Sequence, residues 1–137
     1  MKNFIVGTAV LLLILSFPLQ FALEVYNSQR ISRFSNIVYT STQTARLEGY
    51  FTTTNIGKLK TELLDTFPDL SEADIYIDVT TTPKYRTNEF DEREAIYYDI
   101  RIPVRKIIAA AGFWGVSDAD NQYMSQRKGF VLSEVLP

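Results

Sequence analysis

The sequence FIVGTAVLLLILSFPLQFAL, residues 4–23, decides how the rest of the chain can fold. It contains no charged residue, and its polar side chains are limited to Thr8, Ser16 and Gln20. A helix of this length rises about 30 Å, which matches the hydrocarbon core of a bilayer. We therefore expect residues 1–23 to form a transmembrane helix. Pro18 removes one backbone hydrogen bond within this helix and is expected to bend it.

A cleaved signal peptide is the alternative interpretation of this segment. Signal peptides have a shorter apolar core and small residues just before the cleavage point. Here the apolar run is longer, and Gln20 and Phe21 precede Ala22, so the sequence favours a permanent anchor. Lys2 lies on the N-terminal side of the run and Glu24 on the other. This bias predicts a cell-membrane protein with a cytoplasmic N-terminus and an extracytoplasmic C-terminal part.

The helix is expected to continue beyond the apolar run as a stalk, residues 24–49. Residues 24–48 contain neither proline nor glycine, so the predicted helix is about 45 residues, roughly 70 Å, long and ends at Gly49. Apolar side chains recur there at helical spacing. The stripe is expected to contact another helix or the following head. Together with Glu24, which could pair with a cation of a neighbouring copy, it supplies the assembly candidates: Glu24, Ile31, Phe34, Val38 and Ala45.

Residues 50–137 are expected to form a small extracytoplasmic α+β head. An amphipathic helix is predicted over residues 55–67, and alternating apolar residues predict strands over 75–79 and 94–104. Pro103 suggests that the second strand lies at an edge or ends there. A last strand, 123–134, is expected to break near Lys128 and Gly129. The predicted fold class is thus a long N-terminal helix with one or two short helices packed on an antiparallel sheet of about three strands.

The run KIIAAAGFW, residues 106–114, allows two interpretations. A short helix closed by Gly112 or Gly115 would place Ile107, Ile108, Ala111 and Trp114 in the core. The alternative is an apolar surface patch used in assembly.

Composition excludes several classes of function. The 137 residues include no cysteine and no histidine, and the net charge is -2. Disulfides, a thiol nucleophile and the commonest metal ligand and general base are therefore absent. A net negative chain does not favour direct nucleic-acid binding. No phosphate-binding loop, serine elbow or calcium-loop spacing is found. We expect no catalytic, metal or cofactor site, and a protein that is not an enzyme.

The plan of the chain resembles that of type IV pilin-like proteins, most closely the TadE-like minor pilins and related pilin-like proteins of Gram-positive bacteria. The likeness lies in the apolar run, in ARLEGYF at 45–51, in the following helix with Leu59 and Leu63, in AIYYDIRIPV at 95–104 and in GFVLSEVL at 129–136. Pilins carry a prepilin-peptidase site in which a glycine is followed five residues later by a glutamate. Gly7 is the possible processing site here, and the fifth residue after it is Leu12.

This resemblance implies a structural subunit or accessory component of a bacterial surface filament, secretion machine or DNA-transfer machine. The N-terminal helix would assemble in the membrane with further copies or with other pilin-like subunits. A protein of another class fits the same features: a membrane-tethered module whose head binds a protein or carbohydrate. A filament subunit needs a fixed contact surface on its helix, whereas a tether does not.

Overall fold

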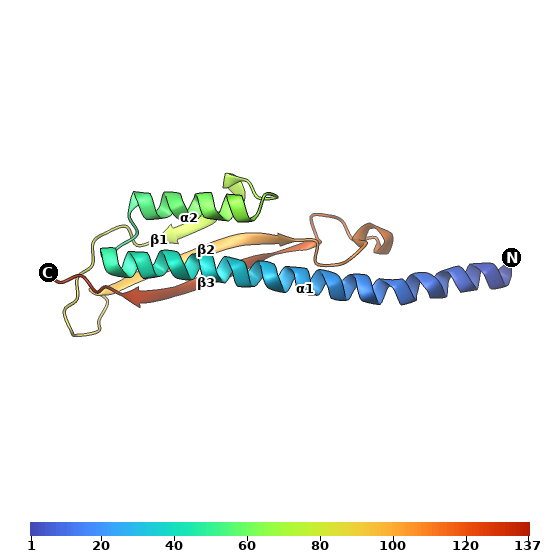
Figure 1. Ribbon diagram of the computed structural model, residues 1–137, viewed down its shortest axis with the longest axis horizontal. Coiled ribbons are helices and arrows are strands. Elements are labelled where there is room, and N and C mark those ends of the chain that lie inside the picture. Colours follow the sequence, from blue (N-terminus) through green and yellow to red (C-terminus); the bar gives the residue numbers. More distant parts are fainter. The chain divides into compact units, whose positions relative to one another are not determined.

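The computed structural model describes all residues, 1–137, and its first element is one uninterrupted helix. Helix α1 extends over Lys2–Glu48 and continues through Pro18 (Figure 1). It ends where Gly49 adopts φ +86° and donates its backbone N–H to the carbonyl of Ala45 at 2.7 Å. A Cβ at this position would also lie 2.7 Å from the carbonyl oxygen of Lys84. The predicted single long helix and its end at glycine are confirmed.

Two compact units form along the chain. The N-terminal unit consists of Met1–Ile31 and Val104–Tyr123, and the sheet unit consists of Ser32–Pro103 and Met124–Pro137.

Helix α2, Thr53–Thr66, belongs to the sheet unit. Its N-cap is Thr52, whose hydroxyl accepts a hydrogen bond from the Asn55 N–H at 3.1 Å. Leu59 and Leu63 form the buried side of the helix, as their spacing predicts. The short 3-10 helix η1, Glu72–Asp74, leads from α2 to the first strand.

The sheet has three strands in the order β1-β2-β3. They are β1, Tyr76–Val79, β2, Ala95–Arg105, and β3, Gln122–Leu132. Strands β1 and β2 are antiparallel, with Tyr76 opposite Arg101. The Ser133 N–H bonds the Glu94 carbonyl beside the start of β2, so β3 is antiparallel to β2 as well. The structure is therefore the predicted α+β fold.

Two details of the predicted strands were wrong, the edge position of the second strand and the break in the last one. Strand β2 is central, and of the two alternatives for Pro103 the structure agrees with the strand end: Pro103 is buried two residues past the last β1–β2 pair at Arg101, and β2 ends at Arg105. Strand β3 continues through Gly129. A Cβ on Gly129 would lie 2.9 Å from the Tyr98 hydroxyl, so this glycine makes room for a neighbouring tyrosine instead of ending the strand.

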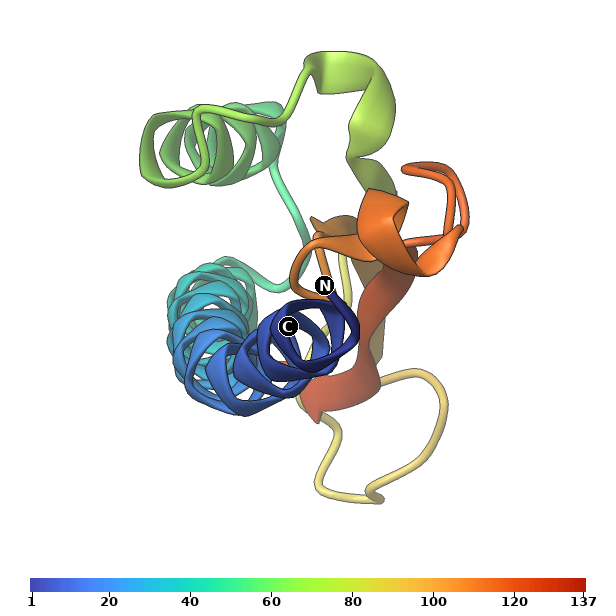
Figure 2. The same ribbon diagram turned by 90° about the vertical axis from the view of Figure 1, so that its right-hand side faces the viewer.

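The core of the sheet unit lies between the helices and one face of the sheet. Figure 2 shows that the C-terminal part of α1 and helix α2 lie on the same side of the strands. The largest cluster of buried apolar side chains joins these layers: Phe34, Ile37, Val38, Leu59, Leu63, Phe67, Leu70, Ile100 and Ile102. A second cluster contains Ala45, Phe51 and Ile96. The alternation expected along β2 is confirmed, because Ile96, Ile100 and Ile102 are fully buried.

A polar bridge joins the two helices beside this core. The Ser41 hydroxyl donates to Asn55 Oδ1 at 2.8 Å, and Asn55 Nδ2 donates to the Ser41 carbonyl at 2.9 Å. Both residues are buried. The small polar side chains of α1 thus allow α2 to approach closely, and each buried polar atom of the bridge has a partner.

In the N-terminal unit, α1 is accompanied by the loop that connects β2 to β3. We call residues 106–121 the β2–β3 loop. Its only regular element is the short 3-10 helix η2, Ala111–Trp114. The helix predicted over 106–114 is therefore reduced to one short turn. Of the residues expected to face the core, Ala111 is buried, whereas Ile108 and Trp114 are 40% and 49% exposed.

Candidate functional site

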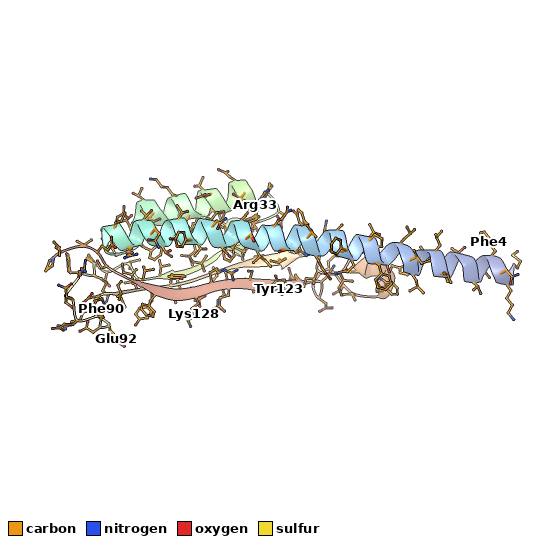
Figure 3. All side chains as sticks on the ribbon, turned by 60° about the horizontal axis from the view of Figure 1, so that its bottom comes forward. Phe4, Arg33, Phe90, Glu92, Tyr123 and Lys128 are labelled. Atoms are coloured by element: carbon orange, nitrogen blue, oxygen red, sulfur yellow. The ribbon has the colours of Figure 1, made fainter.

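No residue of the apolar segment of α1 is buried, and most of its side chains are exposed. An 18-residue window of α1 has a mean hydropathy of 2.2, and none of it is buried. Figure 3 shows Phe4 near the N-terminal end of α1, where side chains project from the helix in all directions. This helix is long and apolar enough to cross a membrane, and a core helix of a soluble protein would instead be mostly buried.

The three polar side chains of this segment all have hydrogen-bond partners within the chain. Thr8 donates its hydroxyl proton to the Phe4 carbonyl at 2.9 Å, and Ser16 donates to the Leu13 carbonyl at 2.7 Å. Gln20 binds the backbone of the β2–β3 loop. Unpaired polar groups are costly in hydrocarbon, so this pattern suits a helix surrounded by lipid.

The side chains of Gln20 and Asn27 hydrogen-bond the backbone of the β2–β3 loop and hold it against α1. Gln20 Nε2 donates to the Ile107 carbonyl at 2.9 Å, and Gln20 Oε1 accepts from the Ala109 N–H at 2.9 Å. Further along α1, Asn27 Nδ2 donates to the Lys106 carbonyl at 3.2 Å. The loop backbone therefore lies against the face of α1 that carries these two amides.

Asn121 binds the same stretch of loop from its other end. Asn121 Oδ1 accepts from the Ile108 N–H at 2.7 Å, and Asn121 Nδ2 donates to the Ile108 carbonyl at 3.1 Å. The Asn121 carbonyl accepts from the N–H groups of Lys106 and Ile107 at 2.9 and 3.4 Å. Every backbone polar group from the Lys106 N–H to the Ala109 N–H consequently has a partner.

An open hollow of about 530 Å³ lies between α1 and this loop. Leu19, Ala22 and Leu23 line it on the side of α1, and residues 108–112 line it on the side of the loop. The lining is mainly apolar, with Lys106, Asp118 and Asn121 as its polar members. It offers no set of groups suited to acid–base or nucleophilic chemistry.

The predicted assembly residues occupy different environments. Phe34, Val38 and Ala45 are buried in the core of the sheet unit, and Ile31 is half-buried. A neighbouring copy could reach the three buried side chains only by displacing this chain's own α2 and sheet. Glu24 is exposed on α1. Gly7 is exposed within α1, and apart from the adjacent backbone of the helix no atom lies within 4 Å of where its Cβ would be.

The sheet unit contains a tightly bonded ion pair on β2. Arg101 donates to Asp99 Oδ1 from Nε at 3.0 Å and to Asp99 Oδ2 from Nη2 at 2.6 Å. Gln126 adds a third hydrogen bond at 2.9 Å. These bonds, led by that of Arg101, lower the pKa of Asp99 to about 2. The bidentate geometry indicates a structural ion pair rather than a proton donor.

A second buried carboxylate shapes the charged loop between β1 and β2. Glu94 is 1% exposed and accepts hydrogen bonds from the Thr87 hydroxyl and from the N–H groups of Glu89 and Phe90. The Thr87 hydrogen bond is the main cause of a Glu94 pKa below its usual value. From the sequence, Glu94 could not be distinguished from the exposed charged residues of the same loop. Glu92 is one of these, and Figure 3 shows it at the outer end of the loop.

No group of three or more acidic side chains in the structure could hold a metal ion. Comparison with protein-family models, with curated proteins and with solved structures gives no match. Sequence reasoning missed the role of Gln20, Asn27 and Asn121, whose side chains bind the backbone of the β2–β3 loop. The only sequence signal for this role was Gln20, a single polar residue near the outer end of an apolar run.

Proposed function

We propose that this protein is a single-pass membrane protein that acts as a structural, pilin-like subunit of a bacterial envelope assembly. The observation that carries the proposal is the apolar segment of α1, in which no residue is buried while its three polar side chains bond within the chain. Such a surface is stable in lipid and unfavourable in water. The N-terminus would lie in the cytoplasm and the sheet unit outside the cell.

The continuity of α1 supports a structural role. The same helix supplies the apolar segment and contributes Phe34, Ile37 and Val38 to the core of the sheet unit. A subunit that packs through its N-terminal helix needs its assembling segment and its folded head on one continuous element. A tether for a binding module has no such requirement.

The surface available for assembly in the membrane is the apolar segment itself. Lipid provides no hydrophobic driving force between helices, so association depends on close packing at small residues. Ala9 and Ser16 are two turns apart and lie on one face of α1, with Leu12 and Leu13 between them. Leu11 lies on the opposite face. We therefore expect neighbouring helices to pack along the face with Ala9 and Ser16, on the N-terminal side of Gln20, because the β2–β3 loop covers the continuation of this face at Gln20 and Asn27.

Cysteine cross-linking tests this assembly directly, because the native chain contains no cysteine. Single cysteines are introduced at each position from 7 to 23, and membranes are treated with an oxidant before non-reducing electrophoresis. Dimer yield is expected to peak every three to four residues, with maxima at Ala9→Cys and Ser16→Cys. Leu11→Cys is the matched control with low yield. Absent dimers, or equal yields at all positions, would reject ordered self-packing.

The outer face of the sheet favours the second candidate, a membrane-tethered binding module. Tyr97 and Phe130 are exposed there with ring centroids 5.9 Å apart, and the Arg101 guanidinium lies 4.8 Å from the centre of the Tyr76 ring. Exposed aromatic and arginine side chains are common in protein interfaces. A chain that gives no cross-links, but loses a ligand on Tyr97→Ser substitution, would favour this function.

A further inference from the structure

We propose that the β2–β3 loop is a second membrane-contact element, whose turn with Phe113 and Trp114 lies in the interfacial layer of the bilayer that α1 crosses. This inference rests on the proposed membrane span. Phe113 and Trp114 are 65% and 49% exposed, and their rings contact each other edge to face at a centroid distance of 5.1 Å. Two adjacent exposed aromatic rings on a loop are unfavourable in water and typical of membrane interfaces.

The position of the loop along α1 places it at the correct depth. Its backbone is bonded to Gln20, which lies inside the apolar run that ends at Leu23. Three residues of helix correspond to about 5 Å. The bonded part of the loop would therefore lie just inside the outer boundary of the hydrocarbon core. Figure 1 shows the loop extending beside α1 toward the N-terminal end of this helix.

The hydrogen bonds of the loop fit this location. Irregular backbone is tolerated at membrane depth only where its polar groups have partners in the protein. The side chains of Gln20, Asn27 and Asn121 bind most of the backbone groups from the Lys106 N–H to the Ala109 N–H, and the Asn121 carbonyl binds the other two, the N–H groups of Lys106 and Ile107. The same bonds hold Lys106 in the left-handed region, at φ 60°, which a free loop would avoid.

The side chains around the turn also match a polar–apolar boundary. Ile108 is 40% exposed and lines the hollow together with Leu19, Ala22 and Leu23 of α1, so the loop and the helix share an apolar surface. The charged side chains of the returning part of the loop, Asp118 and Asp120, are exposed. Two carboxylates give no attraction to anionic lipid, so the contact is an apolar one with the interface and does not depend on lipid charge.

Trp114 is the only tryptophan of the chain, so its fluorescence reports on this loop alone. The full-length protein is reconstituted in zwitterionic phosphatidylcholine vesicles, with bromine atoms placed either near the headgroup or deep in the acyl chains. We expect blue-shifted emission, at least a several-fold reduction of iodide quenching relative to a free tryptophan derivative, and stronger quenching by shallow than by deep bromines.

A control variant separates failure of the loop contact from failure of the membrane span. Phe17→Trp combined with Trp114→Phe moves the fluorophore into the apolar run, about 9 Å from Leu23 along the helix. Its quenching by deep bromines shows that α1 is inserted. If this variant is quenched by lipid while Trp114 stays accessible to iodide, the loop proposal is wrong and the span stands. If neither tryptophan is quenched by lipid, both fail.

Two further results decide the role of the loop. Protection of Trp114 from iodide without quenching by brominated lipid would mean that protein covers it, which overturns the proposal. Gln20→Leu removes two bonds to the loop while keeping the helix apolar, so the backbone of Ile107 and Ala109 loses its partners. This variant is expected to reduce bromine quenching of Trp114, and unchanged quenching would contradict the role of Gln20 in holding the loop at the interface.

Discussion

Replacing Phe34 with alanine is expected to lower the free energy of unfolding of the sheet unit by about 3–5 kcal/mol. Phe34 has no exposed surface and packs in the main core cluster with residues of α2 and β2. Removing the ring takes away its burial and leaves a cavity, and it also removes the contact with the Arg127 guanidinium, 5.9 Å from the ring centre. The total free energy of unfolding of a small domain is only about 5–15 kcal/mol, so this loss is large.

Urea unfolding of the full-length protein in detergent micelles, followed by near-ultraviolet circular dichroism, measures the effect. Tyr39→Ala is the matched control, because Tyr39 lies on the same helix and is 65% exposed. Its change is expected to stay within about 0.5 kcal/mol. Suppose instead that Phe34→Ala unfolds at the same urea midpoint as the native protein and loses only its oligomers. Phe34 would then contact a second copy rather than its own sheet unit.

The proposed membrane span predicts that the combined substitution Leu13→Arg and Ile14→Arg releases the protein from the membrane. Both residues lie at the middle of the apolar run, and both are exposed. Each arginine at the centre of a transmembrane helix costs about 2.5–3.5 kcal/mol on insertion scales, so the pair costs roughly 5–7 kcal/mol. The protein is expected in the supernatant after alkaline carbonate extraction, whereas the native chain stays in the pellet.

Ser28→Arg with Gln29→Arg is the control for added charge. These two residues are exposed on α1 beyond the apolar run, where arginine meets water or headgroups. The control is expected to remain in the pellet. Equal retention of both double variants would show that α1 does not carry the attachment to the membrane.

Periodic patterns in the sequence were sufficient to predict the elements that bury one face. Leu59 and Leu63 identified α2, and the alternation through Ile96, Ile100 and Ile102 identified β2 with its buried side. A periodic stripe shows that a face is covered but not what covers it. Phe34 and Val38 therefore suggested contact with another helix or with the head, and in the structure their partners are α2 and β2 of the same chain.

The β2–β3 loop could not be derived in this way, because its shape depends on hydrogen bonds between residues far apart in the sequence. Gln20 and Ala109 are separated by 89 positions, and no local pattern links them. The break expected at Gly129 failed for a related reason. The glycine is needed for the ring of Tyr98 on the adjacent strand, and a cross-strand neighbour is not visible in the local sequence.

The most direct test of a membrane-spanning α1 is the accessibility of single cysteines to a membrane-impermeant maleimide, in a chain that has no cysteine of its own. We predict that Lys58→Cys, exposed on α2, is labelled on intact cells, that Asn3→Cys is labelled only after permeabilisation, and that Leu13→Cys is labelled in neither case. Labelling of Leu13→Cys by the aqueous reagent in intact membranes, or labelling of Lys58→Cys only after permeabilisation, would contradict a membrane-spanning α1 with an exported sheet unit.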